Sequence, residues 1–321
     1  MAVVAADGRA IKAAADLLRH GELVAFPTET VYGLGADATN GRAVAALFAA
    51  KRRPRFNPLI AHVADVAAAA RLAELPELGR RLAAAFWPGP LTLVVARRAD
   101  CPVADLATAG LATLALRVPA HPVAQLLLRE VDRPIAAPSA NRSGHISPTR
   151  AEHVAADLGG TVAAILDGGA SGIGLESTVV DVMGEPIILR PGGIARADIA
   201  RVLGRPIDVA DGEPARPASP GMAARHYAPA AALRLNARSV GDGEALLAFG
   251  PPIRHVGAVV NLSPSADLAE AAANLYAALR ALDRSGARRI AAMPIPEEGL
   301  GEAINDRLRR AARAPSTPHE A

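Results

Sequence analysis

The amino-acid sequence predicts an α/β protein in which a large domain with a mixed sheet is followed by a smaller α/β domain. Over residues 8–207, apolar segments of strand length alternate with segments of helical periodicity, a pattern typical of α/β folds. Several closely spaced strands toward the end of this range indicate a mixed sheet rather than a wholly parallel one. Residues 208–229 are rich in proline and show no periodicity, which predicts a linker. Short apolar strands and a long helix over 230–314 predict the second domain.

The first elements of the large domain follow from apolar spacing and from prolines. Residues 11–20 have the spacing of an amphipathic helix, and 23–26 form an apolar strand that ends at the turn-prone segment 27–30. A helix over 41–52 ends before Pro54, because the residue before a proline is pushed out of the α conformation. The large domain is therefore expected to begin with a helix, a strand, a turn and a second helix.

The alternation continues through the rest of the chain. The large domain is expected to contain, in order, a strand at 58–63, one or two helices over 65–86, strands at 86–96 and 112–118, a helix near 122–130, a strand entering a polar loop at 135–144, a helix from 149, and strands at 161–169, 177–183 and 186–192. The second domain is expected to contain strands at 245–250, 257–262 and 289–295 and a helix over 266–286.

Composition and charge exclude several classes of protein. The 321 residues are 51% hydrophobic and 21% charged, which excludes a largely disordered chain. No apolar stretch is long enough to span a membrane and the N-terminal segment lacks the apolar core of a secretory signal, so we expect a cytoplasmic protein without a membrane partner. The single cysteine, Cys101, excludes a disulfide framework and a cysteine-built zinc site. A net charge of +3 is too small to indicate nucleic-acid binding by charge alone.

The segment KRRPRFNPL, residues 51–59, is the first candidate for chemistry. A stiff loop that presents Lys51, Arg53 and Asn57 in fixed order would suit a triphosphate, because lysine supplies a point charge and arginine a two-pronged donor. Lys51 and Lys12 are the only lysines among 35 basic residues, which makes each of them notable. The alternative is a helix end whose cations complement the helix dipole. We expect Lys51 to be a surface cation whose removal has little effect on stability.

The loop APSANRSGHISPT, residues 137–149, is the second candidate. Its small hydroxyl and amide side chains, with Ser139, Asn141 and Ser147 among them, allow close approach to an anion or a sugar. An ordinary polar loop is the alternative. The chain contains no Walker P-loop and no strand-linked GxGxxG fingerprint, so any nucleotide would bind outside the common nucleotide-binding folds.

Polar residues inside or at the ends of apolar strands form a third group. Arg117 and Arg190 each interrupt a hydrophobic run, so each must snorkel, pair or meet a ligand. Thr28, Glu29 and Thr30 lie at one strand end, and Ser177 and Thr178 lie at another, and ligands of α/β sheets usually bind at strand ends. His62 is alone on an apolar segment, and a satisfied core histidine is the alternative to a site residue there.

Seven sequence blocks in the large domain occur in an order that matches a known family. They are FPTETVYGLGADA, KRRPRFNPLIAH, FWPGPLTLV, LRVPAHP, PSANRSGHISPT, LESTVVD and ILRPGGI, and they cover most of residues 21–195. With them the chain resembles the YrdC/Sua5 family of L-threonylcarbamoyladenylate synthases. Two later blocks, SPGMAARHYAP and GLGEAINDRLRRAA, are similar to the long form of that family, which has a linker and a C-terminal Sua5 domain.

The resemblance implies a YrdC-like domain with a twisted mixed sheet, a linker that acts as an active-site lid, and a smaller Rossmann-like Sua5 domain. It implies a nucleotidyltransferase that converts L-threonine, bicarbonate or CO2, and ATP with Mg2+ into L-threonylcarbamoyladenylate and pyrophosphate. This reaction is the first step toward N6-threonylcarbamoyladenosine in tRNA. The partners it implies are a downstream threonylcarbamoyl transferase complex and, indirectly or weakly, tRNA.

The resemblance also implies a set of site residues, carried over by motif. Lys51 and Arg53 would be catalytic, since they can neutralise charge on the phosphates. The threonine site would consist of Thr30, His62, Arg117, the backbone at Ala137, and Ser177. The ATP site would consist of Lys51, Arg53, Asn57, Thr113, Ser139, Asn141, Ser147, Arg190 and the linker residue Tyr227. No protein ligand of the metal is implied.

Two positions depart from the family pattern. Arg52 stands where the family commonly has a small residue between the lysine and the arginine of KxRP, and we expect it to point outward. Ala223 and Ala224 stand where the linker often has bulkier residues, which leaves Tyr227 and its neighbours to make any lid contact. An RNA-binding module of the same fold without synthase activity is the alternative function.

Overall fold

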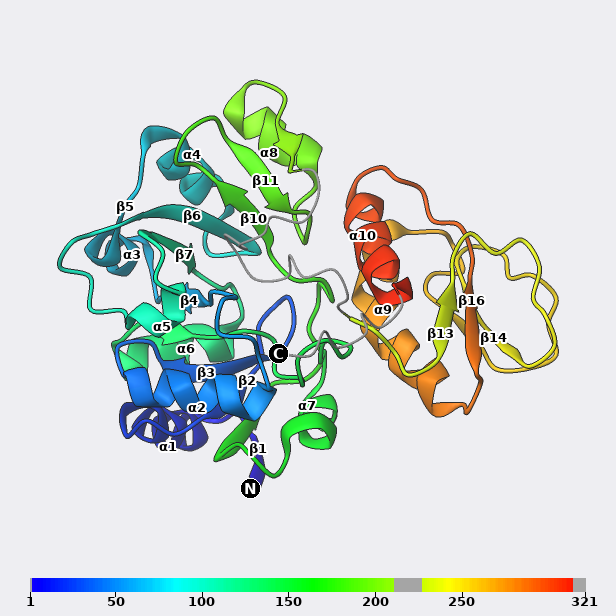
Figure 1. Cartoon of the computed structure of the whole chain (residues 1–321), viewed down its shortest axis with the longest axis horizontal. Helices are drawn as coiled ribbons and strands as arrows, with labels where there is room; N and C mark the ends of the chain where they lie inside the picture. The colour runs from blue at the N-terminus through cyan, green and yellow to red at the C-terminus, as the bar shows by residue number, and fades with distance from the viewer. Residues whose placement is uncertain (1, 211–226, 314–321) are drawn as a thin grey trace, which may run out of the picture. The chain divides into compact units, whose positions relative to one another are not determined.

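The computed structural model describes residues 2–210 and 227–313, and the chain divides into two compact units (Figure 1). The first unit consists of Met1–Ser143 and Ser147–Met222, and the second of Gly144–Ile146 and Ala223–Ala321. Most of the predicted linker, including Ala223 and Ala224, lies outside the described residues. None of the described helices is long and apolar enough to span a membrane.

The first unit contains a mixed sheet, as the sequence predicts, and this sheet has twelve strands. Its strand order is β1-β9-β2-β3-β8-β4-β7-β6-β10-β11-β12, with β5 paired to β6. The strands are β1 (Ala2–Ala5), β2 (Val24–Phe26), β3 (Gly33–Asp37), β4 (Ile60–His62), β5 (Ala73–Glu74), β6 (Leu91–Arg97), β7 (Thr113–Arg117), β8 (Ile135–Ala136), β9 (Ala164–Asp167), β10 (Thr178–Asp181), β11 (Ile187–Arg190) and β12 (Asp208–Val209). The strands β1 and β12 lie on either side of the predicted range 8–207 and extend the sheet at both ends.

Eight helices belong to the described part of the first unit. They are α1 (Gly8–Arg19), α2 (Gly41–Lys51), α3 (Val66–Leu72), α4 (Glu77–Phe86), α5 (Asp105–Thr108), α6 (Pro122–Val131), α7 (Ala151–Leu158) and α8 (Arg196–Leu203). Side-chain caps begin several of them: Asp7 accepts the Ala10 N–H at 2.8 Å, and Asn40 accepts the Arg42 N–H at 3.0 Å. The helix α2 ends at Lys51 and is capped by Arg52, whose φ of 50° is left-handed, so it stops before Pro54 as expected.

The core of the first unit lies in three apolar clusters around the sheet. The largest contains side chains of α2, α4, α7 and α8, and a second joins α1 and α6 to β2 and β9. The third is small and contains side chains from four neighbouring strands, Ile60, Val94, Ala115 and Val179. Since side chains alternate along a strand, Arg117 lies on the same face of β7 as Ala115. The small cluster therefore marks the face of the sheet on which polar site residues lie.

The second unit has a four-stranded parallel sheet in the order β13-β16-β14-β15, with helices α9 and α10 against it (Figure 1). Its elements are β13 (Ala232–Arg234), β14 (Glu244–Ala248), β15 (Val259–Asn261), α9 (Leu268–Arg284), β16 (Arg289–Ala292) and α10 (Leu300–Ala312). Within this unit the Ala228 N–H donates to the carbonyl oxygen of Gly144 at 2.9 Å. The predicted α/β character of the second domain is confirmed.

We predict that a chain ending at Ala210 folds by itself. By that residue the sheet is complete, because β12 pairs with β11 and the Ala210 N–H donates to the carbonyl oxygen of Ile188 at 2.8 Å. Thermal unfolding followed by circular dichroism should show one cooperative transition. A chain ending at Asp181, which lacks β11 and β12, should lose that cooperativity. A broad, non-cooperative melt of the longer fragment would contradict this prediction.

Candidate functional site

The turn that follows β2 is built on a pair of threonine hydroxyls. Thr28 Oγ1 lies 2.7 Å from Thr30 Oγ1, donates to the carbonyl oxygen of Val31 at 2.6 Å and accepts the Val31 N–H at 3.2 Å. Both threonines are buried. Because Thr28 gives its only hydroxyl proton to Val31, the shared proton of the pair belongs to Thr30. The predicted site residue Thr30 is therefore held in a fixed orientation by its own turn.

His62 and Arg117 end the parallel strands β4 and β7 and are partners in the strand register. His62 is buried, with Nδ1 at 3.2 Å from the carbonyl oxygen of Ile60 and its ring edge-on to Phe26. Burial first, and then the charge of Arg117, lowers the pKa of His62 from 6.5 to about 3. The imidazole is therefore neutral at physiological pH and donates from only one nitrogen.

Arg117 is a buried cation that is only partly bonded by the protein. Its Nη2 donates to Glu29 Oε1 at 2.6 Å, and its Nε donates to the carbonyl oxygen of Gly89 at 3.3 Å. No hydrogen bond from Nη1 occurs within residues 2–210 and 227–313, although the residue is only 4% exposed. The open Nη1 edge therefore suits a carboxylate.

Glu29 is the partner of Arg117 that sequence reasoning did not assign. Its position between two threonines in the turn after β2 was visible, but nothing in the sequence identified Arg117, 88 residues away, as its partner. The Arg117 side chain is 5% exposed and the Glu29 side chain 14% exposed, so this ion pair is largely shielded from solvent, unlike a surface contact.

Ser177 and Arg190 meet at the ends of β10 and β11. Arg190 Nη2 donates to the carbonyl oxygen of Ser177 at 2.8 Å and to its hydroxyl at 3.1 Å. The same hydroxyl lies 2.7 Å from Thr92 Oγ1. The preceding residue, Glu176, accepts the hydroxyl proton of Ser147 at 2.6 Å. Three predicted site residues, Ser147, Ser177 and Arg190, are thus brought together.

Gly192 explains why the Ser177 segment has little freedom. A Cβ at this position would lie 2.5 Å from the Ser177 carbonyl carbon and 2.5 Å from the Thr178 nitrogen, closer than real Cβ contacts allow. The Gly193 N–H also donates to the carbonyl oxygen of Glu176 at 2.9 Å. The close packing of Gly192 and the hydrogen bond of Gly193 therefore fix the backbone at Ser177.

The expectation that Lys51 is a surface cation is wrong. It is 2% exposed, and its Nζ donates to the carbonyl oxygens of Ser139, at 2.5 Å, and Asn141. The Ser143 N–H in turn donates to the carbonyl oxygen of Lys51 at 2.9 Å. Burial lowers the pKa of Lys51 well below its usual value, and the nearby charge of Arg53 lowers it further. The last turn of α2 packs beneath the loop 137–149, whose carbonyl oxygens need a donor there.

Arg53 and Asn57 shape the loop that follows Lys51. Arg53 is buried and donates to the carbonyl oxygens of Asn57, at 3.2 Å, and Pro58, at 2.9 Å. Asn57 is buried too, and its Oδ1 has no hydrogen-bond partner within the described part of the chain. An orphaned buried acceptor fits a ligand that brings a donor. Arg52 is exposed, so its expected outward position is confirmed.

The backbone of the second loop is tied to the strands beside it. The Ala137 N–H donates to the carbonyl oxygen of Ile60 at 3.0 Å, and the Ala140 N–H donates to that of Tyr32 at 2.8 Å. Ser139 forms an isolated bridge with Gly33, the first residue of β3. Because β4 carries His62, these bonds connect the Lys51 loops to the strand that carries part of the predicted threonine site.

Two predicted residues, Thr113 and Tyr227, make none of these contacts. Thr113 begins β7, at the opposite end from Arg117 and about 13 Å from it along the strand. Tyr227 belongs to the second unit, where it is 1% exposed, stacks on Tyr276 at 5.7 Å and lies under the guanidinium of Arg307 at 5.0 Å. Its φ of 64° is left-handed. Both faces of the ring are therefore already occupied.

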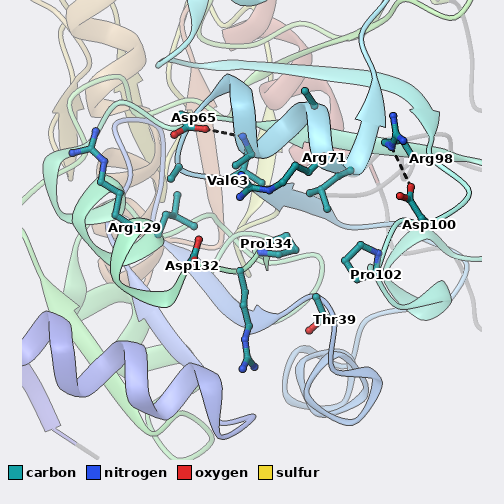
Figure 2. A pocket seen from close by; sticks show the side chains of 16 residues that line it. Thr39, Val63, Asp65, Arg71, Arg98, Asp100, Pro102, Arg129, Asp132 and Pro134 are labelled. Carbon is teal, nitrogen blue, oxygen red and sulfur yellow. Dashed lines mark hydrogen bonds and ion pairs between the residues drawn. The ribbon is translucent and has the colours of Figure 1, made fainter.

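A separate pocket of about 870 Å3 lies near the end of β4, and none of the predicted site residues lines it (Figure 2). Several of its charged groups are already bonded, since Asp65 accepts the Ala68 N–H at 2.7 Å and Arg98 pairs with Asp100 at 3.1 Å. We assign no role to this pocket. Among the described residues no group of three or more His, Cys, Asp or Glu side chains is placed to hold a metal ion.

Comparison with known proteins adds to this geometry. The family described as "Telomere recombination" (Sua5_yciO_yrdC) matches residues 16–192, and the family described as "Threonylcarbamoyl-AMP synthase, C-terminal domain" matches residues 194–313. A threonylcarbamoyl-AMP synthase of Bacillus subtilis is 45% identical over 94% of this chain and 92% of its own length. One of Pyrococcus abyssi is 44% identical over 94% of both chains.

The solved structures lead to the same relatives. The crystal structure of P. abyssi Sua5 complexed with L-threonine superposes with a TM-score of 0.89 at 42% identity, covering 95% of each chain. A variant of that protein with an adjacent histidine and tyrosine replaced by alanine superposes with a TM-score of 0.88 at 40% identity, covering 95% of this chain and 93% of that chain.

We predict that His62→Gln reduces the amount of unfolding free energy that the protein loses as the pH falls. The pKa of His62 is about 3 in the folded protein and 6.5 as an ordinary histidine. Above pH 6.5 its contribution to stability is complete; as the pH falls below that value, the unfolded chain binds a proton that the folded protein does not. Between pH 7 and pH 5 the variant should lose about 2 kcal/mol less unfolding free energy than the wild type.

Urea denaturation at the two pH values measures this difference. His20→Gln, which changes an exposed histidine in the same unit, is the control and should decline as the wild type does. Equal declines for His62→Gln and the wild type would show that His62 has the same pKa in the folded protein as in the unfolded chain, which would contradict the prediction.

Proposed function

This chain belongs to the Sua5/YrdC family of threonylcarbamoyl-AMP synthases, and we propose that it is such an enzyme. It would convert L-threonine, bicarbonate or CO2, and ATP into L-threonylcarbamoyladenylate and pyrophosphate, the first step toward N6-threonylcarbamoyladenosine in tRNA. The observation that carries the proposal is the open edge of the buried Arg117 guanidinium, at the strand ends that also present His62. The complex of the P. abyssi relative with L-threonine supports it.

The threonine subsite would be built around Arg117. Its open edge would bind the α-carboxylate, because guanidinium and carboxylate form paired hydrogen bonds. Thr30 and Ser177, each held by a neighbouring hydroxyl, would recognise the side-chain hydroxyl. Neutral His62 and the backbone at Ala137 would complete the subsite. A free amino acid would therefore meet the Arg117–Glu29 ion pair and several fixed dipoles.

The ATP subsite would use the two loops that Lys51 joins, together with the end of β11. Lys51 and Arg53 would place positive charge near the phosphates. Arg190, at the end of β11, would add a further positive charge. The orphaned Oδ1 of Asn57 would accept a hydrogen bond from the nucleotide. The remaining residues of this subsite would be Thr113, Ser139, Asn141 and Ser147.

Catalysis would consist of placement and charge stabilisation, since no covalent nucleophile stands out in the sequence. An oxygen of N-carboxythreonine would attack the α-phosphorus of ATP and pyrophosphate would leave. Bound Mg2+ would neutralise charge on the phosphates. The described residues offer no cluster of ligands for it, so it would be held mainly by the nucleotide, and no step here depends on it.

The linker would act as a lid, with Tyr227 reaching the nucleotide. A lid would keep water from the reactive adenylate and would open to release it to a downstream transferase complex. Within its own unit the Tyr227 ring is stacked on Tyr276 and lies near the guanidinium of Arg307. The residues between 211 and 226, which would form most of the lid, lie outside the described part of the chain.

Pyrophosphate release across amino acids tests the proposed function. With ATP and bicarbonate present, threonine should be preferred over valine by roughly 10³-fold or more in kcat/KM, because valine would leave the hydroxyl-binding groups unpaired. Serine, which lacks one methyl group, should lose about 1 kcal/mol, or roughly fivefold. Equal use of valine and threonine would contradict the subsite, and absence of pyrophosphate release would favour the RNA-binding alternative.

Lys51→Ala should abolish most synthesis and also destabilise the protein. The charge removed would normally stabilise the phosphoryl transition state, so kcat should fall on the order of 10² to 10³-fold. The carbonyl oxygens of Ser139 and Asn141 would each lose the hydrogen bond from Lys51, at about 1–3 kcal/mol of unfolding free energy, while Ser139 would keep the Asn141 N–H as a donor. Lys12→Ala, on the exposed face of α1, is the matched control and should change neither quantity. Normal turnover by Lys51→Ala would overturn the phosphate role.

A further inference from the structure

The carboxylate of Glu29 joins the turn after β2 to the end of β7. Its Oε1 accepts from Arg117 Nη2 at 2.6 Å, and its Oε2 accepts the Ala120 N–H at 3.0 Å. The backbone of Glu29 is fixed as well, because its carbonyl oxygen accepts the Ile173 N–H at 2.8 Å. Both oxygens of the carboxylate are thus committed to donors that follow one another along the chain.

Arg117 is held from two sides, which fixes the plane of its guanidinium. Glu29 holds Nη2, and the carbonyl oxygen of Gly89 holds Nε. The Gly89 N–H donates back to the carbonyl oxygen of Val118 at 2.8 Å, so this second acceptor is tied to the same turn. With these two positions occupied, the edge that remains open is the one that carries Nη1.

We propose that Glu29 is a positioning residue for substrate recognition: it fixes the orientation of Arg117 and balances its charge, so that the Nη1 edge faces the α-carboxylate of threonine. The proposal rests on the proposed function, because it takes threonine as the ligand of Arg117. Glu29 itself does not bind the reacting atoms. It acts through Arg117.

The hydrogen bonds of Glu29 indicate that it supports Arg117 and does not compete with the substrate carboxylate for it. For Glu29 to release Arg117 and admit the substrate in its place, the bond between Oε2 and the Ala120 N–H would have to break or rotate with it. The substrate carboxylate has a free position at Nη1 and does not need that exchange. Glu29 therefore stays in place when threonine binds, and its removal weakens binding.

The charges around Arg117 also indicate that Glu29 supports substrate binding. His62, the register partner of Arg117, is neutral at physiological pH and cannot share the charge. Glu29 is the carboxylate that forms an ion pair with Arg117 among the described residues. A buried cation without this partner would be free to turn toward other acceptors, and the edge offered to the substrate would no longer be defined.

Glu29→Gln in the full-length protein is the central test. The side chain keeps its size but has one acceptor oxygen for two converging donors, Arg117 Nη2 and the Ala120 N–H, so one of them loses its partner. Threonine affinity, measured by calorimetry on the nucleotide-free protein, should fall about tenfold. The KM for threonine should rise by a similar factor, while the KM for ATP stays within about twofold. Glu29→Asp keeps the charge on a shorter side chain, and its threonine affinity should lie between those of Glu29→Gln and the wild type. If Glu29→Gln does not fold, the affinity of Glu29→Asp tests the proposal.

Asp37→Asn is the matched control. Asp37 is another buried carboxylate in the first unit, and it pairs with Arg133 at 2.7 Å and accepts the Thr39 N–H at 2.9 Å. Its neutralisation should lower the melting temperature without changing threonine affinity. A purely structural role for Glu29 would make the two variants alike.

Three results would overturn the proposal: unchanged threonine affinity in Glu29→Gln, tighter binding, or an equal weakening of ATP. Tighter binding would show that Glu29 competes with the substrate. If the wild-type protein binds threonine and releases pyrophosphate but the variants match it, only the positioning role fails. If the wild type does neither, the proposed function fails and this inference falls with it.

Discussion

The side chain of Lys51 holds together the two loops on which the proposed ATP subsite depends. It ends α2 and donates to two carbonyl oxygens of the loop 137–149, while its own carbonyl oxygen accepts the Ser143 N–H. A buried ammonium is unfavourable by several kcal/mol unless hydrogen bonds compensate it. The loop must therefore turn its carbonyl oxygens inward at Ser139 and Asn141. A change at Lys51 affects both the charge of the site and the path of the backbone around it.

The second constraint is the register of β4 and β7. Parallel pairing places His62 beside Arg117 at the carboxyl ends of the strands, where the chain leaves the sheet. Once Arg117 is buried there, it needs a partner, and the turn after β2 supplies Glu29. The same cation helps to keep His62 neutral. One strand register thus determines the position, the protonation state and the ion pairing of neighbouring groups.

The sequence predicted the fold correctly, because apolar runs, prolines and motif order are local signals, and the same motifs supplied the candidate site residues. It missed what depends on long-range contact. The burial of Lys51 depends on acceptors 88 residues away, and a lysine at a helix end gives no local sign of being buried. The strands β1 and β12 are short and exist through pairing with β9 and β11, so their own residues indicate them weakly. Thr113 and Arg117 belong to the same strand, β7, but the motif does not show that they lie at its opposite ends.

The two buried cations differ in a way that matches two different ligands. Lys51 donates to main-chain oxygens, which orient it without cancelling its charge, whereas Arg117 is paired with the carboxylate of Glu29. A triphosphate carries several negative charges, so a site for it gains from cations whose charge is not neutralised by the protein. A free amino acid carries no net charge at neutral pH, and a neutral Arg117–Glu29 pair with one open edge is matched to it. The division of charge within the first unit therefore agrees with a polyphosphate on the side of Lys51 and a zwitterion on the side of Arg117.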